Sequence, residues 1–186
     1  MRKSTFLIFA GGLLLASLAW VILTPVLFPF AQSADKAVAA HPGFQAPGFS
    51  LETPAGDIVS LSDHNGQPVL VFLWASWCPI CKGAMPDLET VYQDYADQGF
   101  EILAVDMAFQ DTLSTAIEYF QTEAYSYTML IDRDGQMAQD YQMHGLPTSI
   151  LVGPDGTVLD VTIGSGMSAG YLSVQLDQVF AIAEGE

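Results

Sequence analysis

The sequence predicts an α/β sandwich preceded by one N-terminal transmembrane helix. Three observations lead to this prediction. Short apolar runs typical of strands alternate with longer segments of helical periodicity over residues 48–186. The only two cysteines, Cys78 and Cys81, stand where one apolar run gives way to a helical segment. The chain also begins with a long uncharged stretch that directly follows two basic residues.

Residues 1–31 are predicted to be a membrane anchor or signal segment. Ser4 to Ala31 holds 28 residues without a charge, whereas a cleaved signal peptide has an apolar region of about 7 to 15 residues. Pro25 and Pro29 shorten the helical part to roughly 21 residues, which still suffices for a span. We therefore expect a retained anchor, and small-residue patterns at 31–33 and 37–39 leave cleavage as the alternative.

Either alternative exports the rest of the chain, because Arg2 and Lys3 favour the cytoplasmic side. We predict a single-pass protein of the cell membrane whose catalytic domain is extracytoplasmic. Residues 32–47 are rich in alanine, contain two prolines and show no periodicity, so we expect a flexible tether before a domain at 48–186.

The predicted domain is strongly acidic. Only Lys82 and Arg133 of the five basic residues belong to it, against 20 of the 21 acidic residues, which gives a formal charge of −18. This charge argues against nucleic-acid binding and favours basic partners. Adaptation to a salty medium explains it equally well.

The first half of the domain reads as a hairpin, a buried strand and a long helix. Residues 49–51 and 58–61 flank a turn at 54–57, which indicates a β-hairpin. The continuous apolar run from Val69 to Trp74 is typical of a strand covered on both faces. A helix is expected from Cys78 to about Gln98, capped by Gly99, with a kink at Pro86.

The second half alternates strands and helices. The expected strands are Ile102–Val105, Tyr127–Ile131, Thr148–Val152 and Val158–Ile163, and the expected helices are Leu113–Glu123, Gln136–Tyr141 and Ala169 to about Ala183.

The spacing of the cysteines predicts dithiol–disulfide exchange. Cys78 stands at or just before a helix N-terminus, where free backbone N–H groups and the helix dipole stabilise a thiolate. Cys81, one turn further on, can attack a mixed disulfide formed at Cys78. A purely structural disulfide is disfavoured because so short a loop stabilises weakly, and zinc would need four ligands. We expect no metal, and no cofactor beyond the redox-active Cys78–Cys81 pair.

Two separated motifs carry a resemblance to a known family. Residues 74–82 read Trp-Ala-Ser-Trp-Cys-Pro-Ile-Cys-Lys, with Met85-Pro86 after them, and residues 141–148 read Tyr-Gln-Met-His-Gly-Leu-Pro-Thr. In this order they resemble the membrane-anchored thioredoxin-like proteins of the TlpA/ResA type, over roughly residues 45–180. The insertion at 109–127 also fits this branch better than a minimal thioredoxin.

The resemblance implies a thioredoxin-like three-layer sandwich with an added N-terminal β-hairpin, and a thiol–disulfide oxidoreductase. It implies reduction of exported protein disulfides, such as those of apocytochrome c, with electrons from a membrane donor of the thiol–disulfide relay type. The implied catalytic residues are Cys78 as attacking thiol, Cys81 as resolving thiol and Pro147 as the cis proline. The implied substrate-binding residues are Trp77, Pro79, Ile80 and Leu146.

Two positions depart from the family pattern. Phe72 stands where thioredoxins have a buried acid, and Ala84 stands where ResA-like members often have a glutamate. Glu52, Asp106 and Glu89 are the candidates to replace these acids. Without such an acid, and with Lys82 beside Cys81, a more stable thiolate would favour oxidant behaviour.

Two other functions remain as alternatives. A thiol peroxidase would want a serine or threonine shortly before its cysteine and an arginine nearby, and Ser76 is a partial match. A Cu(I) chaperone for an exported oxidase would use the two thiolates with Met143 or His144, which precede Pro147.

Overall fold

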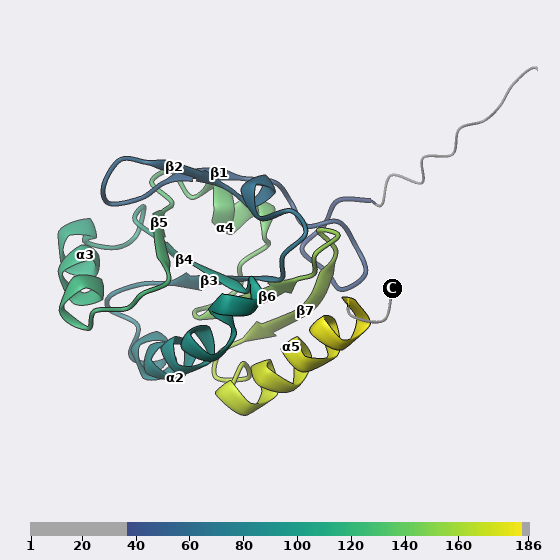
Figure 1. Ribbon diagram of the computed structural model, residues 1–186. Helices are drawn as coiled ribbons and strands as arrows, with labels where there is room; N and C mark the ends of the chain where they lie inside the picture. The colour runs from purple at the N-terminus through teal and green to yellow at the C-terminus, as the bar shows by residue number, and fades with distance from the viewer. Residues whose placement is uncertain (1–36, 184–186) are drawn as a thin grey trace, which may run out of the picture. The chain divides into compact units, whose positions relative to one another are not determined.

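A seven-stranded mixed β-sheet runs through residues 37–183, the part of the chain that the computed structural model describes (Figure 1). The strands are β1 (Ser50–Glu52), β2 (Ile58–Ser60), β3 (Val69–Trp74), β4 (Glu101–Asp106), β5 (Thr128–Ile131), β6 (Thr148–Val152) and β7 (Val158–Ile163). Their order in the sheet is β2-β1-β5-β4-β3-β6-β7. Strands β3, β4 and β5 are parallel, and the other neighbouring pairs are antiparallel.

The helices are α2 (Pro79–Tyr95), α3 (Leu113–Thr122), α4 (Gln136–Asp140) and α5 (Ala169–Ala183), with 3₁₀ turns η1 (Leu61–His64) and η2 (Ala96–Gln98). The predicted α/β order is confirmed. The long helix ends at Tyr95 and continues to Gln98 only as η2, and Gly99 closes it with a φ of 95°. A left-handed residue at this position favours glycine.

Two hydrophobic clusters cover the two faces of the sheet. Alternate residues of β3 point to opposite faces, so Leu70, Phe72 and Trp74 join the cluster under α2, α3 and α5. Val69, Val71 and Leu73 join the cluster that includes residues of α4. Figure 1 shows α2 and α5 beside each other, with α4 near the β1–β2 hairpin. Every residue of β3 is buried, as the apolar run predicts.

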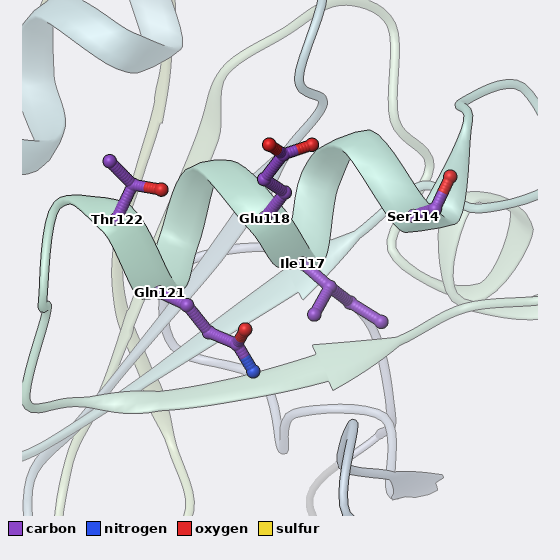
Figure 2. Close-up of a pocket in the computed structure, with 5 residues that line it drawn as sticks. All are labelled: Ser114, Ile117, Glu118, Gln121 and Thr122. Carbon is purple, nitrogen blue, oxygen red and sulfur yellow. The ribbon is translucent and has the colours of Figure 1, made fainter.

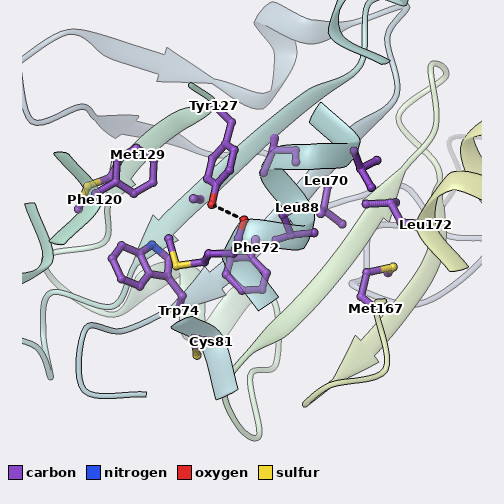
Figure 3. Close-up of a cluster of buried hydrophobic side chains, with 14 of the residues drawn as sticks. Leu70, Phe72, Trp74, Cys81, Leu88, Phe120, Tyr127, Met129, Met167 and Leu172 are labelled. Carbon is purple, nitrogen blue, oxygen red and sulfur yellow. Dashed lines mark hydrogen bonds between the residues drawn. The ribbon is translucent and has the colours of Figure 1, made fainter. Parts of the chain in front are cut away.

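The segment between β4 and α4 adds an aromatic wall to the first cluster. The Phe120 ring lies 5.4 Å from the rings of both Tyr125 and Tyr127, measured between centroids, and 6.2 Å from that of Trp74. In Figure 3, Tyr127 points towards α2, and its hydroxyl donates to the carbonyl of Met85 in that helix at 3.5 Å. The insertion at residues 109–127 therefore packs against the face of the sheet that α2 covers.

The predicted tether differs from the structure over its second half. Residues 37–47 pack on the domain: Ala40 and Ala46 are buried, and the Ala46 N–H donates to the Gly156 carbonyl at 2.9 Å. Gly43 and Phe44 exchange two backbone hydrogen bonds with Val158, both of 2.8 Å. The sequence did not predict that this segment packs on the domain. Alanine is readily buried, but an alanine-rich segment shows no hydrophobic periodicity.

The predicted membrane anchor at 1–31 and the first residues of the predicted tether lie outside the described residues. Within 37–183, no helix combines the length and the apolar character that crossing a bilayer requires.

Candidate functional site

The two cysteines occupy the N-terminus of α2, immediately after the central strand β3. Cys78 has extended backbone angles and is the N-cap residue, and Pro79 takes the first helical position. The Cys81 N–H donates to the Cys78 sulfur at 3.1 Å. Proline suits the first helical position because it lacks the N–H that would otherwise have no partner. The sequence thus places a sulfur where helix N–H groups converge.

Cys78 and Cys81 form a disulfide with an S–S distance of 2.11 Å and a Cα–Cα distance of 5.3 Å. Cys81 is 0% exposed and Cys78 is 4% exposed. Both belong to the cluster drawn in Figure 3, together with Phe72 and Trp74. Cys78 is therefore slightly more exposed than Cys81, although both residues are buried.

Exposed apolar side chains border the disulfide. Trp77 is 56% exposed and Ile80 is 53% exposed, and Pro79 between them is also exposed. Exposed apolar side chains that adjoin one another, unlike single ones, are typical of contact surfaces. These three residues are where the resemblance expects substrate contacts.

The other expected site residues reach the same region through the sheet. The Leu146–Pro147 peptide bond is cis, as the resemblance implies. Pro147 directly precedes β6, whose Thr148 pairs with Leu73 near the end of β3. The Leu146 side chain packs against the cluster that contains both cysteines. The fold thus places the Leu146–Pro147 segment beside the strand end from which the cysteine loop leaves.

A segment after β4 contacts the two residues that precede Cys78. The Ser76 hydroxyl donates to Asp111 at 2.7 Å, and the Ser76 N–H donates to the same carboxylate. The Trp77 indole N–H donates to the Gln110 carbonyl at 3.1 Å. Gln110 and Asp111 were not among the predicted site residues. The sequence offers only a weak signal for them, since polar residues before a helix usually serve as caps.

Of the three acids considered as replacements, only Asp106 is buried. Glu52 lies on the hairpin and accepts from Arg133 at 3.0 Å, with both side chains about half exposed. Glu89 accepts hydrogen bonds from Ser126. Asp106 is the last residue of β4 and pairs in register with Trp74.

Burial, which is the largest cause, and the neighbouring acids Asp111 and Asp132 together raise the pKa of Asp106 to about 8. Burial would also raise the pKa of Asp111, but the hydrogen bonds from Ser76 and Thr112 outweigh burial and lower that pKa. The two carboxyl groups therefore have opposite tendencies: Asp106 keeps its proton at neutral pH and Asp111 is ionised.

Other residues near the motifs have different partners from those that the sequence suggests. The Lys82 ammonium lies 4.4 Å from the centre of the Tyr119 ring, a cation–π contact that directs it to α3. Met143 packs against the cluster on the face of the sheet opposite the cysteines, and His144 is exposed. The Ser76 hydroxyl is used by Asp111, and Arg133 pairs with Glu52.

A separate hollow lies along α3 (Figure 2) and is lined by Ser114, Ile117, Glu118, Gln121 and Thr122. Its side chains are neutral except for one carboxylate, and it includes neither cysteine. This hollow therefore does not overlap the disulfide.

Comparison with known proteins identifies relatives of this chain. The AhpC/TSA family matches residues 42–161. The thioredoxin-like protein YneN of Bacillus subtilis is 34% identical over 143 residues, covering 76% of this chain and 82% of that protein. The thiol–disulfide oxidoreductase ResA of Geobacillus kaustophilus is 31% identical over 165 residues, covering 89% of this chain and 91% of that protein.

A solved structure confirms the thioredoxin-like fold. A Chlorobium tepidum protein assigned as a thiol:disulfide interchange protein DsbE superimposes with a TM-score of 0.69 at 29% identity. The match covers 75% of this chain and 97% of that protein. The chain therefore belongs to the AhpC/TSA family, within which it is a ResA-like thiol–disulfide oxidoreductase of thioredoxin fold.

Proposed function

We propose that this protein is anchored in the cell membrane and reduces disulfides of proteins outside the cytoplasm through Cys78 and Cys81. The observation that carries the proposal is the disulfide at the N-terminus of α2, with the Cys81 N–H directed at the Cys78 sulfur. The uncharged stretch from Ser4 to Ala31 supports the anchor. The resemblance to ResA-like proteins makes apocytochrome c a candidate substrate.

The proposed reaction transfers two electrons in two exchange steps. The Cys78 thiolate attacks one sulfur of the substrate disulfide, which forms a mixed disulfide and releases the other substrate sulfur as a thiolate. The Cys81 thiolate then attacks the Cys78 sulfur and releases the second substrate sulfur as a thiolate. The protein is left with the Cys78–Cys81 disulfide, and the released thiolates take up protons from solvent.

This cycle requires a supply of electrons. A dithiol donor must reduce the Cys78–Cys81 disulfide by the same two steps in reverse, and we propose that the donor is a membrane protein of the thiol–disulfide relay type. The exposed Trp77, Pro79 and Ile80 would contact both the substrate and the donor, because both must reach the Cys78 sulfur.

Substitution of each cysteine tests the proposal. With full-length protein and insulin as the disulfide substrate, we expect Cys78→Ser to abolish reduction, because the attacking thiolate is lost. We expect Cys81→Ser to accumulate a mixed disulfide at Cys78, visible by mass spectrometry and removed by dithiothreitol. Reduction at the wild-type rate in both variants would contradict the proposal.

The reduction potential tests the direction of exchange. Equilibration of the full-length protein with dithiothreitol or glutathione buffers should give a potential near or below about −220 mV, which suits a reductant. A value near about −120 mV would identify a disulfide-forming oxidant instead.

A further inference from the structure

The loop that carries Cys78 lies between β3 and α2, but it is held in place by hydrogen bonds to the segment that follows β4. Ser76 is buried, and its N–H and hydroxyl groups both donate to Asp111, while the Trp77 indole donates to the Gln110 carbonyl. The position of the loop therefore depends on the segment after β4. Asp111 contributes the charged acceptor in this contact, and hydrogen bonds to ionised acceptors are the stronger ones.

Asp111 accepts hydrogen bonds from three donors. Besides Ser76, the Thr112 N–H donates to Asp111 at 2.6 Å. Three donors favour the ionised carboxylate, which agrees with its lowered pKa. The acceptor strength of this group is what fixes Ser76.

Asp106, the last residue of β4, has no such donors among the described residues. Its side chain is 0% exposed, and neither carboxyl oxygen has a hydrogen-bond donor among the described residues. A buried carboxylate without donors is costly, so the acid form is favoured. When protonated, Asp106 gains a donor of its own, and Asp111 is the first of the neighbouring acids that act on its pKa.

The charged groups that act on Asp106 are both acidic. Asp111 comes from the loop that follows β4, and Asp132 comes from the turn after β5. The residue of β3 that pairs with Asp106 is Trp74, which does not titrate. Asp132 itself accepts from backbone N–H groups at the start of α4, including that of Gly135 at 3.1 Å. No cation among these groups would offset a negative charge on Asp106.

We propose that Asp106 and Asp111 form a proton-linked clasp that positions the Cys78 loop. With its proton, Asp106 donates to the Asp111 carboxylate, and Asp111 in turn fixes Ser76. When Asp106 releases the proton to solvent, two adjacent carboxylates repel each other and the contact with Ser76 weakens. Both acids are positioning residues, and this inference rests on the proposed role of Cys78 as the attacking thiol.

Through the clasp, the reactivity of the Cys78 thiol depends on the protonation state of Asp106. Release of the Ser76 contact would shift Cys78 from the helix N-terminus, where the Cys81 N–H stabilises its thiolate. The thiol would then be less ionised and less reactive. In neutral and mildly acidic media the clasp is closed, and in alkaline media it opens.

Alkylation of Cys78 measures this link without any protein substrate. The reduced full-length protein is treated with iodoacetamide between about pH 6 and 10, and labelling of Cys78 is followed by mass spectrometry. We expect the wild-type rate to depart from a single-ionisation curve near pH 8, falling below it by about threefold or more, because two linked groups titrate.

Two variants assign the departure to the clasp. Asp106→Asn is expected to give a single-ionisation curve, because its amide donates to Asp111 at every pH. Asp111→Asn is also expected to give a single-ionisation curve, because no second carboxylate remains for an ionised Asp106 to repel. Asp97→Asn, an exposed position on η2, makes the same change of charge and should retain the wild-type profile.

A single-ionisation curve in the wild type, or a departure that persists in Asp106→Asn, would overturn the inference. Neither result depends on insulin reduction. If Cys78→Ser retained insulin reduction, the proposed function would fail while the alkylation profile still reported the clasp.

Discussion

Asp106 has an environment unlike that of an ordinary aspartate, and the consequence is a stability that depends on pH. Its side chain is fully buried between β3 and β5, and its pKa is raised to about 8 from an ordinary value of 3.8. The folded protein therefore binds a proton that the unfolded chain releases above about pH 4. The stability contributed by this group is present below about pH 4 and is lost as the pH rises towards 8.

We predict that Asp106→Asn stabilises the protein at neutral pH. Each unit of pKa difference corresponds to about 1.4 kcal/mol, so the wild type loses up to about 4 kcal/mol from this group between pH 4 and 7. The amide has no charge to lose, so its unfolding free energy should depend less on pH. Urea unfolding of both proteins at pH 4, 6 and 8 measures the difference. An equal slope of stability against pH in the two proteins would contradict the raised pKa.

Single residues of the site differ in how well the sequence predicted them. The Cys-x-x-Cys spacing predicted the chemistry of Cys78 and Cys81 locally, and the structure shows that these two residues form a disulfide. The resemblance implied the cis bond before Pro147, and the structure confirms it. Asp111 was not identifiable, because its partner Ser76 is 35 positions away along the chain. Asp106 was one of three candidate acids, and burial separates it from the other two.

At the scale of elements, the short segment 37–47 decides where the folded domain begins. It closes over the start of β7 through backbone hydrogen bonds of Gly43, Phe44 and Ala46 with Val158 and Gly156. The sequence suggested a tether here, because small residues and prolines without periodicity are typical of linkers. Its backbone nevertheless has partners that lie more than a hundred positions further along the chain.

We predict that this segment stabilises the domain measurably. A chain that begins at Gly48 should unfold at a lower temperature than one that begins at Ala37, since it lacks the backbone hydrogen bonds of residues 43–46 and the burial of Ala40 and Ala46. Three net hydrogen bonds correspond to about 3 kcal/mol. Calorimetry of the two chains checks this prediction. Equal melting temperatures would show that the segment contributes only surface contacts.

Element types and most boundaries followed from local pattern. The strands Thr148–Val152 and Val158–Ile163 and the last helix agree with their predicted ranges. The predicted and observed boundaries differ where an α-helix becomes a 3₁₀ turn. This occurs at η2, the last turn before Gly99. Hydrophobic periodicity cannot separate a 3₁₀ turn from the end of an α-helix over three residues.

At the scale of the whole molecule, the excess of acids sets the long-range interaction with a substrate. Residues 48–186 carry a formal charge of −18, whereas the border of the disulfide is formed by the neutral Trp77, Pro79 and Ile80. We expect a negative field around an apolar contact surface. Such a field accelerates encounter with cationic partners and slows encounter with anionic ones.

We predict opposite salt dependences for two model substrates. Reduction of a lysine-rich peptide disulfide should slow by about tenfold as NaCl rises from about 0.02 to 0.5 M, because salt screens the attraction. Reduction of a glutamate-rich peptide disulfide should accelerate over the same range. Stopped-flow kinetics with a neutral serine-rich peptide disulfide serves as the control. The same trend for both charged peptides would exclude electrostatic steering.

The sequence by itself determined the order and type of the elements and the charge, and it predicted the cysteine chemistry, because each depends on residues that are neighbours along the chain. Only the tertiary structure decided which acid is buried, that Asp111 contacts the Cys78 loop and that residues 37–47 belong to the domain. These features depend on contacts between segments far apart in sequence, made where β3, β4 and β5 pair. Burial and hydrogen bonding at such contacts follow from packing, for which a linear pattern has no signal.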